Sequence, residues 1–267
     1  MKYGICTGVK KDENGFFIPH FDFLEKCGFD YYELAINNVM KFSEEEFAEF
    51  LKFQKEKNIN FTVCCNFIAG DIRLTGNAFD KEKFKNYIDK TVKRILAVGA
   101  QKVVLGSGAA RNVDPSFSKE KAMEQMLFCI DYAAEVCAKN EITILLEHLN
   151  NTECNLLNLF EETAQIMKKY NDKYKKCVID FYHFNVGNED VALVEKYKEQ
   201  IAHVHYAYKV KRNFPDAMRF EEVKGDFEAI KNIGYNDTFS IECTPSHLDN
   251  EPEEYVLAMQ KIRDFFN

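Results

Sequence analysis

The chain has 267 residues, of which 46% are hydrophobic and 29% charged, and its formal net charge is −8 at pH 7. So acidic a chain disfavours nucleic acid as a partner, because phosphate backbones bind basic surfaces. No run of residues approaches the length of a membrane span, and the first residues lack the apolar stretch of a signal peptide. We therefore expect a cytoplasmic protein without membrane contacts, and its nine cysteines, none in a C-x-x-C pair, are expected to be reduced, buried thiols.

Apolar strands alternate with amphipathic helices through the first half of the chain. Strands are expected at Tyr3–Cys6, Phe29–Leu34, Ile59–Asn66 and Lys102–Gly106. The helices between them are expected at Ile18–Cys27, from Ser43 onward, at Asp80–Val98 and at Lys119–Lys139. Pro19 would occupy the first turn of its helix, and Ser43 has Glu46 at capping-box spacing.

The second half repeats the scheme. Its strands are expected at Ile142–Leu146, Cys177–Asp180, Ile201–His205 and Thr238–Glu242, and its helices at Leu156–Tyr170, Asp190–Tyr197, Phe227–Asn232 and Glu253–Phe266. Eight strand–helix units result, with no linker and no leftover segment. Strict alternation requires parallel strands, because each helix returns the chain to the same edge. The sequence therefore predicts an α/β fold, a (β/α)8 TIM barrel forming one catalytic domain over residues 1–267.

The alternative architecture is a doubly wound open sheet. It is disfavoured because no G-x-G-x-x-G follows the first strand. For the same reason no nucleotide cofactor is expected.

Four residues able to bind a hard metal ion end four consecutive strands: Glu147, Asp180, His205 and Glu242. Any one of them alone is more often a strand-end cap, a salt-bridge partner or a satisfied core residue. Together they are spaced by about one strand–helix unit each, so they should converge on one half of the carboxyl-terminal rim, where barrel enzymes place catalytic groups. Three carboxylates and one imidazole suit Mn²⁺, Mg²⁺ or Co²⁺.

Other polar residues lie near this expected rim. His183 comes just past a strand and could face a substrate, and Glu153 sits in the loop after Glu147. Lys209, Lys211 and Arg212 follow His205, where a charge run is usually solvated but could here orient an anionic oxygen. Three further residues are expected outside the cluster: Glu33 is a weaker candidate for the rim, His203 should lie one layer below His205, and Cys243 should face the other side of its strand.

At these residues the chain resembles the xylose-isomerase-like superfamily of sugar isomerases and epimerases, and in particular ketose 3-epimerases of the tagatose/psicose epimerase type. The clearest match is the segment from Glu147 to Glu153 with Leu157-Asn158 after it, which is similar to the family's Glu-x-x-Asn-Arg-x-Glu…Leu-Asn segment. The Asp180-x-x-His183, His203-x-His205 and Glu242 positions follow in order and spacing.

The resemblance implies one divalent metal, Mn²⁺ first with Mg²⁺ or Co²⁺ as alternatives, held by Glu147, Asp180, His205 and Glu242. It implies that Glu147 and Glu242 transfer protons through a cis-enediolate. It also implies that sugar hydroxyls are bound by Glu153, by His183, and by Lys211 or Arg212. By analogy with such barrels, the chain could also form a homo-oligomer.

The sequence departs from the family pattern at several points. Asn151 stands where the family has Arg, the substrate-binding Arg falls at Lys211 with Arg212 adjacent, and the chain has no Trp. The identity of the sugar, its phosphorylation, and the choice between epimerisation and aldose–ketose isomerisation therefore stay open.

Three other functions were considered. The same fold and metal could serve hydroxypyruvate isomerisation or the dehydration of a keto-inositol. The metal-dependent abasic-site endonucleases share the barrel but need several metals and many more His ligands, against six His and a net charge of −8 here. A non-catalytic carbohydrate-binding barrel is the fourth reading, and it would require that no metal is bound.

Overall fold

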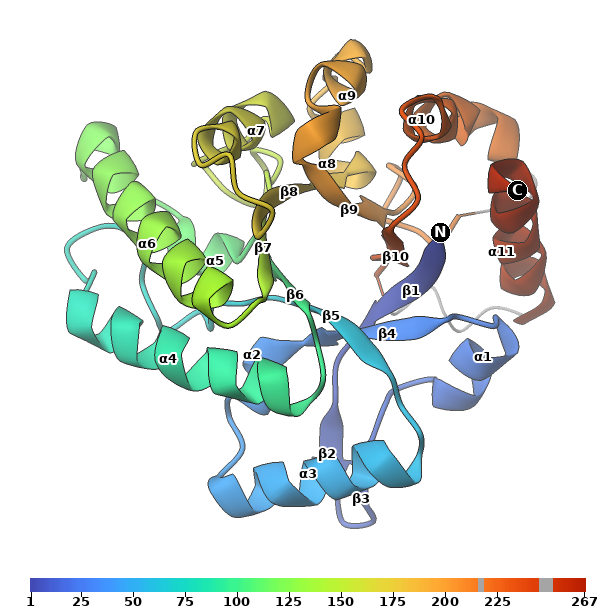
Figure 1. Ribbon diagram of the computed structural model, residues 1–267, viewed down its shortest axis with the longest axis horizontal. Helices are drawn as coiled ribbons and strands as arrows, with labels where there is room; N and C mark the ends of the chain where they lie inside the picture. Colours follow the sequence, from blue (N-terminus) through green and yellow to red (C-terminus); the bar gives the residue numbers. More distant parts are fainter. Residues whose placement is uncertain (216–218, 245–251) are drawn as a thin grey trace.

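Eight parallel strands close into a barrel in which each strand is hydrogen-bonded to its neighbours in chain order (Figure 1). The computed structural model describes residues 1–215, 219–244 and 252–267. The barrel strands are β1 (Lys2–Thr7), β4 (Tyr31–Ala35), β5 (Phe61–Cys65), β6 (Lys102–Leu105), β7 (Thr143–Leu146), β8 (Lys175–Asp180), β9 (Ile201–Tyr206) and β10 (Thr238–Ile241). The predicted (β/α)8 TIM barrel is confirmed.

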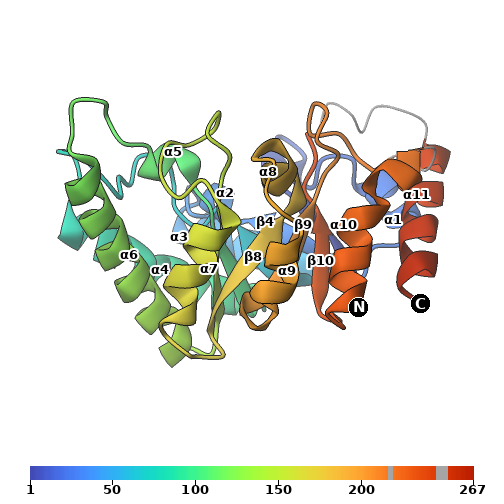
Figure 2. The ribbon, with the colours of Figure 1, turned by 90° about the horizontal axis from the view of Figure 1, so that it is seen from above.

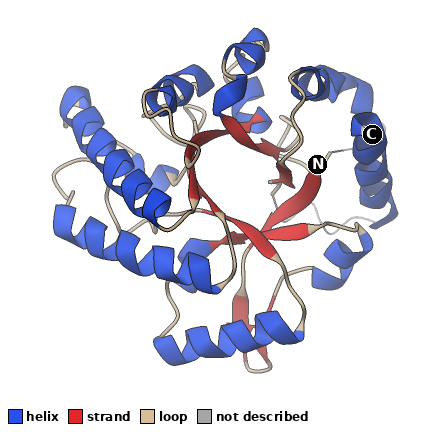
Figure 3. Cartoon of the chain, viewed as in Figure 1, coloured by secondary structure: helices blue, strands red, loops and turns tan. Residues whose placement is uncertain are grey.

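Helices surround the strands on the outside of the barrel (Figure 3). The surrounding helices are α1 (Phe21–Lys26), α3 (Glu44–Glu56), α4 (Lys81–Ala97), α6 (Lys119–Lys139), α7 (Phe160–Lys168), α9 (Ala192–Lys196), α10 (Phe220–Asn232) and α11 (Pro252–Phe266). Short helices follow three strands directly or through a turn: α2 (Ile36–Val39), α5 (Gly108–Arg111) and α8 (Phe181–Val186); a 3-10 turn, η1 (Lys198–Gln200), connects α9 to β9. Figure 2 shows α5 and α8 on the side of the barrel opposite the N-terminus, where the strands end.

Local sequence signals account for several helix starts. The capping box of α3 is present in full, because Ser43 Oγ accepts a hydrogen bond from the Glu46 N–H at 3.1 Å while Glu46 Oε2 accepts one from the Ser43 N–H at 3.0 Å. Asp80 caps α4 by accepting hydrogen bonds from two N–H groups of its first turn.

The structure corrects three boundary predictions. An antiparallel hairpin, β2 (Lys10–Asp12) and β3 (Gly15–Phe17), stands between β1 and α1 where no extra segment was expected. Helix α1 begins only after His20, which has φ 59, so Pro19 precedes the helix instead of occupying its first turn. Helix α10 begins well before the predicted Phe227, and α7 begins later than the predicted Leu156.

Two apolar layers stabilise the barrel because alternate residues along a strand face opposite sides. The outer layer lies between the strands and the helices, and includes the fully buried Phe50, Phe84 and Phe160. The inner layer fills the barrel with Tyr31, Val63, Val104, Leu145 and Val178. This alternation carries the residue at each inward-facing strand end onto the rim.

Among the described residues, no helix combines the length and apolar character needed to cross a membrane. All nine cysteines are free thiols.

Candidate metal centre and active site

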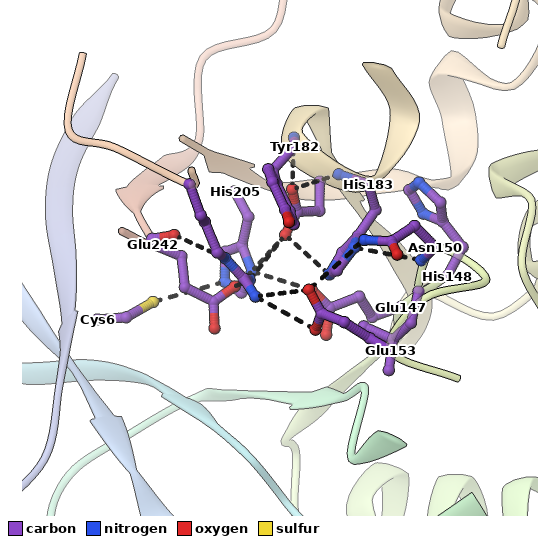
Figure 4. Close-up of polar contacts among 12 residues, drawn as sticks. Cys6, Glu147, His148, Asn150, Glu153, Tyr182, His183, His205 and Glu242 are labelled. Atoms are coloured by element: carbon purple, nitrogen blue, oxygen red, sulfur yellow. Dashed lines mark hydrogen bonds and ion pairs between the residues drawn. The ribbon is translucent and has the colours of Figure 1, made fainter. Parts of the chain in front are cut away.

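The four predicted strand-end ligands meet at the carboxyl-terminal mouth of the barrel. Glu147 follows β7 directly, Asp180 ends β8, His205 lies in β9, and Glu242 follows β10. One ligand atom of each lies within 4.8 Å of those of the other three. His205 Nδ1 is the centre of this group, 2.9 Å from Glu242 Oε2, 3.2 Å from Glu147 Oε1 and 3.9 Å from Asp180 Oδ2 (Figure 4).

A glycine makes room for the Glu147 carboxylate. A Cβ atom built on Gly106, which follows β6, would lie 1.9 Å from Glu147 Oε2 and 3.1 Å from its Cδ. Contacts below 3.0 Å essentially never occur for real Cβ atoms. The sequence predicts Gly106 only as the end of a strand, yet its missing side chain leaves the space in which the Glu147 carboxylate lies.

Glu33 lies behind His205 and orients its ring. Its Oε1 is 2.9 Å from His205 Nε2, and its Oε2 is 2.9 Å from His203 Nε2. All three side chains are fully buried. A carboxylate on one ring nitrogen fixes the tautomer and turns the other nitrogen toward a metal, as in carboxylate–histidine–metal arrangements. Glu33 therefore belongs to the support of the ligand cluster, and not to the cluster itself.

The polar contacts continue from Glu33 down the barrel axis. His203 Nδ1 is 2.8 Å from Thr238 Oγ1, which in turn accepts a hydrogen bond from Lys102 Nζ at 3.0 Å. Lys102 also forms an ion pair with Asp237 at 2.6 Å. We call Lys102, Thr238, His203 and Glu33 the axial column. His203 thus takes the place one layer below His205 that its sequence position predicts.

The pKa values of the carboxyl groups in the cluster are shifted in opposite directions. Burial raises the pKa of Glu147 above its ordinary range, although a hydrogen bond with His205 opposes this. Burial would also raise the pKa of Glu242, but Arg212 and His205 lower it to about 2. For Asp180, burial is likewise outweighed, and His183 and Arg212 hold its pKa below the ordinary value. Burial therefore shifts the pKa of one carboxyl group upward, while nearby cationic groups shift the pKa of the other two downward.

Arg212 is the basic residue that reaches the cluster. Its Nη2 lies 2.7 Å from Glu242 Oε2 and 3.4 Å from Asp180 Oδ2, while Nη1 is 3.4 Å from Glu153 Oε2. The guanidinium also stacks over the ring of Tyr182, 4.8 Å from its centroid. Tyr182 was not singled out from the sequence, where it follows the strand that ends at Asp180 and no local pattern distinguishes it.

Lys211 does not share this position. Its side chain is exposed, and in the described parts of the chain its recorded contact is made by the backbone carbonyl, which accepts a hydrogen bond from Thr244 Oγ1 at 3.4 Å. Lys211 and Arg212 both have positive φ, 59 and 53, so a tight loop turns the second residue inward and the first outward. Of the two candidates, Arg212 is therefore the one that lies beside the carboxylates, and its contact with a substrate stays a prediction.

His183 and Glu153 border the same space. His183 is fully buried in α8, its Nδ1 accepts a hydrogen bond from the Asn150 N–H at 3.2 Å, and its Nε2 lies 3.6 Å from Asp180 Oδ2. Among the described residues, His183 Nε2 has no hydrogen-bond partner. Glu153 lies in the exposed part of the loop, as does Asn151, so the departure from the family pattern at Asn151 is on the surface.

Two buried residues near Glu147, Arg111 at the end of α5 and His148 in the loop after β7, lie outside the cluster. Arg111 is fully buried and donates a hydrogen bond to the Glu147 carbonyl at 2.8 Å. His148 points away from the cluster (Figure 4), and its Nε2 lies 3.5 Å from Glu189 Oε1. Burial lowers the pKa of His148 to about 3 and raises that of Glu189 to about 7. Arg111 gives no local sequence signal, because a basic residue in a polar loop is usually solvated.

A cavity of about 350 Å³ opens beside the cluster and is lined in part by Cys6, Cys65, Asn66, Glu242 and Cys243. Cys243 was expected to face away from this side. It lines the cavity, but its sulfur is not among the converging ligand atoms of the described residues. A larger cavity, about 530 Å³, lies next to the β2–β3 hairpin and is lined mainly by phenylalanines. It lacks the converging carboxylates, so the smaller cavity is the candidate active site.

The donor set fits a hard divalent cation. Four carboxyl groups, counting Glu33, gather around His205 and Arg212 in a buried place, where uncompensated negative charge is costly. Oxygen donors with one imidazole are the ligands preferred by Mn²⁺ and Mg²⁺.

Comparisons with known proteins agree with this geometry. Residues 21–265 match the family model described as xylose isomerase-like TIM barrel. A D-psicose 3-epimerase of Agrobacterium fabrum is 25% identical over 198 residues, which cover 71% of this chain and 66% of that relative, just under two thirds of its length.

Solved structures show the same fold over the whole chain. A D-psicose 3-epimerase from Clostridium cellulolyticum H10, solved with D-tagatose, has a TM-score of 0.77 at 19% identity and covers 100% of this chain and 98% of its own. A D-allulose 3-epimerase from Methylomonas sp., in complex with D-allulose, has a TM-score of 0.78 at 16% identity and covers 99% of this chain and 96% of its own.

Proposed function

The chain belongs to the xylose isomerase-like TIM barrel family, and from this premise we propose that it is a divalent-metal-dependent isomerase or epimerase of a small sugar or ketose. Residues 1–267 would form its catalytic domain. The observation that carries the proposal is the convergence of three carboxylates and one imidazole within 4.8 Å at the mouth of a barrel. Epimerase relatives and neighbours support the same class of reaction.

The metal would be held by Glu147, Asp180, Glu242 and the Nδ1 atom of His205. A bound divalent ion supplies positive charge that polarises a sugar carbonyl and stabilises the enediolate charge that forms beside it. Mn²⁺ is the first candidate, with Mg²⁺ and Co²⁺ as alternatives.

Glu147 and Glu242 would move the proton on the carbon next to the carbonyl. Two carboxyl groups whose pKa values are driven apart by their surroundings can serve as acid and base. The charged Glu242, held so by Arg212, suits removal of the proton, and Glu147, whose pKa burial raises, suits its return from the other side. General acid–base help of this kind contributes about 10²–10⁴-fold to a rate.

Substrate hydroxyls would be bound by the groups that border the cluster. His183 Nε2 has no hydrogen-bond partner among the described residues, and Arg212 offers a fixed fork of donors next to Glu153. Ketoses are the first substrates to test, because neighbouring structures hold D-tagatose and D-allulose.

Solvent deuterium exchange tests the proposal directly. The protein is loaded with Mn²⁺ and incubated in D₂O with a panel of ketoses, and incorporation beside the carbonyl is followed by NMR. Exchange is expected with at least one ketose and should be abolished by chelation and in Glu242→Gln. Exchange that persists in Glu242→Gln would exclude the two-carboxylate mechanism. No binding of Mn²⁺, Mg²⁺ or Co²⁺ by calorimetry would exclude the metal enzyme and favour a carbohydrate-binding barrel.

The same panel separates reactions that share the site. Hydroxypyruvate and a keto-inositol are included, because the ligand cluster alone serves their isomerisation or dehydration equally well. Turnover of one of these, with no exchange into any ketose, would assign the chain to that chemistry.

A further inference from the structure

Two thiols stand together at the edge of the ligand cluster. Cys6 lies near the end of β1 and Cys65 ends β5. Their sulfur atoms and one oxygen of Glu242 all lie within 4.8 Å of one another. Both cysteines line the 350 Å³ cavity, so they are reachable from its interior. Figure 4 shows the Cys6 side chain directed toward the cluster, with its sulfur 3.9 Å from His205 Nε2.

The barrel brings these thiols together although their strands are not neighbours. Strand β4 lies between β1 and β5, with Glu33 paired to Cys6 and Ala35 paired to Cys65. Cys6, Cys65 and Ala35 pack in the same inner layer of the barrel. Because the side chain of Ala35 is only a methyl group, the thiols from either side can approach each other across it.

We propose that Cys6, Cys65 and Glu242 form a second metal site, selective for a thiophilic divalent cation such as Zn²⁺, next to the hard-metal cluster. Two sulfur donors distinguish it from the oxygen-rich cluster, since thiolates favour Zn²⁺ over Mn²⁺ and Mg²⁺. Three protein ligands leave one position of a tetrahedral ion open toward the cavity. On binding, each thiol releases its proton to solvent as its sulfur–metal bond forms.

Glu242 can serve this site because it has two oxygens. Its Oε2 is engaged with His205 and Arg212, and a carboxylate can bridge two ions. A rival set of Cys6, Glu33 and His205 also converges, but there the Glu33 Oε1–His205 Nε2 contact of 2.9 Å already occupies both partners. The thiol pair with Glu242 is therefore the set with free donors.

An ion at this second site would oppose the proposed sugar reaction, and only this consequence rests on the proposed function. It would hold Glu242 and stand in the cavity through which a sugar must enter. Zn²⁺ is thus expected to inhibit a protein loaded with Mn²⁺ without first displacing the Mn²⁺.

Cadmium titration tests the site, because thiolate-bound Cd²⁺ has an ultraviolet charge-transfer band that oxygen-bound Cd²⁺ lacks. Full-length protein is first saturated with Mn²⁺, and Cd²⁺ is then added alone. The band is expected to reach a plateau at one Cd²⁺ per chain, to be lost in Cys6→Ser and Cys65→Ser, and to be reversed by Zn²⁺. Cys243→Ser is the matched control, because Cys243 lines the same cavity, and there the band should be unchanged.

The outcomes separate this site from the proposed function. A folded wild-type protein that binds Mn²⁺ but gives no band, or a band that survives in Cys6→Ser/Cys65→Ser, overturns the second site and leaves the proposed function standing. A band that depends on both cysteines, in a protein that binds no Mn²⁺, supports the second site while the proposed function fails. Circular dichroism of each variant shows that the fold is kept.

Discussion

Replacing Gly106 by alanine should displace the Glu147 carboxylate, a proposed metal ligand and proton-transfer group, while leaving the barrel intact. The added Cβ would lie 1.9 Å from Glu147 Oε2, and ordinary contact begins at 3.4 Å, so the oxygen must move by about 1.5 Å. A misplacement of about 1 Å at a reacting group can cost about 10²-fold in rate. We therefore expect kcat/KM for ketose deuterium exchange to fall by about 100-fold or more, with a weaker Mn²⁺ affinity.

Stability should respond much less, because the group that must yield is the end of a flexible side chain. The control is Gly225→Ala in α10, where a Cβ meets nothing within 4 Å. This chemically identical substitution should leave exchange unchanged and stabilise the helix by up to about 1 kcal/mol. Exchange rates by NMR, Mn²⁺ affinity by calorimetry and thermal unfolding by circular dichroism measure the three quantities.

A double variant makes the reasoning sharper. Glu147→Asp withdraws the carboxylate by one methylene, so it should be less harmful in the Gly106→Ala background than in the wild type. Strictly additive losses would refute the steric explanation. So would a Gly106→Ala protein whose exchange and Mn²⁺ affinity both stay within about threefold of wild type.

Three further changes have defined outcomes. Glu33→Gln removes the carboxylate that accepts hydrogen bonds from both His203 and His205 and leaves one of these rings without an acceptor. The Mn²⁺ affinity measured by calorimetry should therefore fall about 10–100-fold. The control is Tyr31→Phe, which loses a hydroxyl from the inner layer and should leave the Mn²⁺ affinity unchanged. Glu189 has a pKa raised by burial to about 7 from its ordinary 4.5, so the folded state takes up a proton at Glu189 that the unfolded state lacks between those values, and the contribution of Glu189 to stability should fall as pH rises from 4.5 to 7. In Glu189→Gln this pH-dependent loss in the free energy of unfolding, of order 2 kcal/mol, should be absent when unfolding by denaturant is measured across this pH range. If the pH dependence of the variant equals that of the wild type, the raised pKa of Glu189 is wrong. Arg212→Met should lower kcat/KM roughly thirtyfold, the loss of about 2 kcal/mol for charged hydrogen bonds, whereas Lys211→Met should stay within twofold; the reverse order would place the wrong basic residue in the site.

The fold and the ligand cluster were predictable because both follow from short-range periodicity. Each strand–helix unit returns the chain to the same rim, so the residue that ends a strand, such as Asp180 or Glu242, must lie there. The β2–β3 hairpin escaped prediction because Lys10–Asp12 is exposed throughout and shows no apolar alternation.

What depends on a turn or on distant packing could not be predicted from the sequence. Whether Lys211 or Arg212 enters the site is decided by two consecutive residues with positive φ, a conformation that neither residue type favours. The part played by Gly106 depends on a side chain 41 positions away, and that of Arg111 on a carbonyl in another loop. No local pattern of letters contains such contacts.

The axial column limits how this sequence can drift over generations. It draws its members from β4, β6, β9 and the start of β10, and each member has a hydrogen-bonding partner within 3.0 Å. A substitution at Lys102 or Thr238, far from the mouth, would leave a buried polar group without its hydrogen-bond partner and would disturb the support of His205. Substitutions at the column positions of these strands are therefore expected to occur together. The inward positions Val63, Leu145 and Val178 have apolar side chains that need no hydrogen-bond partner. One apolar side chain of similar volume can replace another there. Variation among descendants of this chain should therefore collect at the inward positions of β5, β7 and β8, while the column positions of β4, β6, β9 and β10 stay fixed.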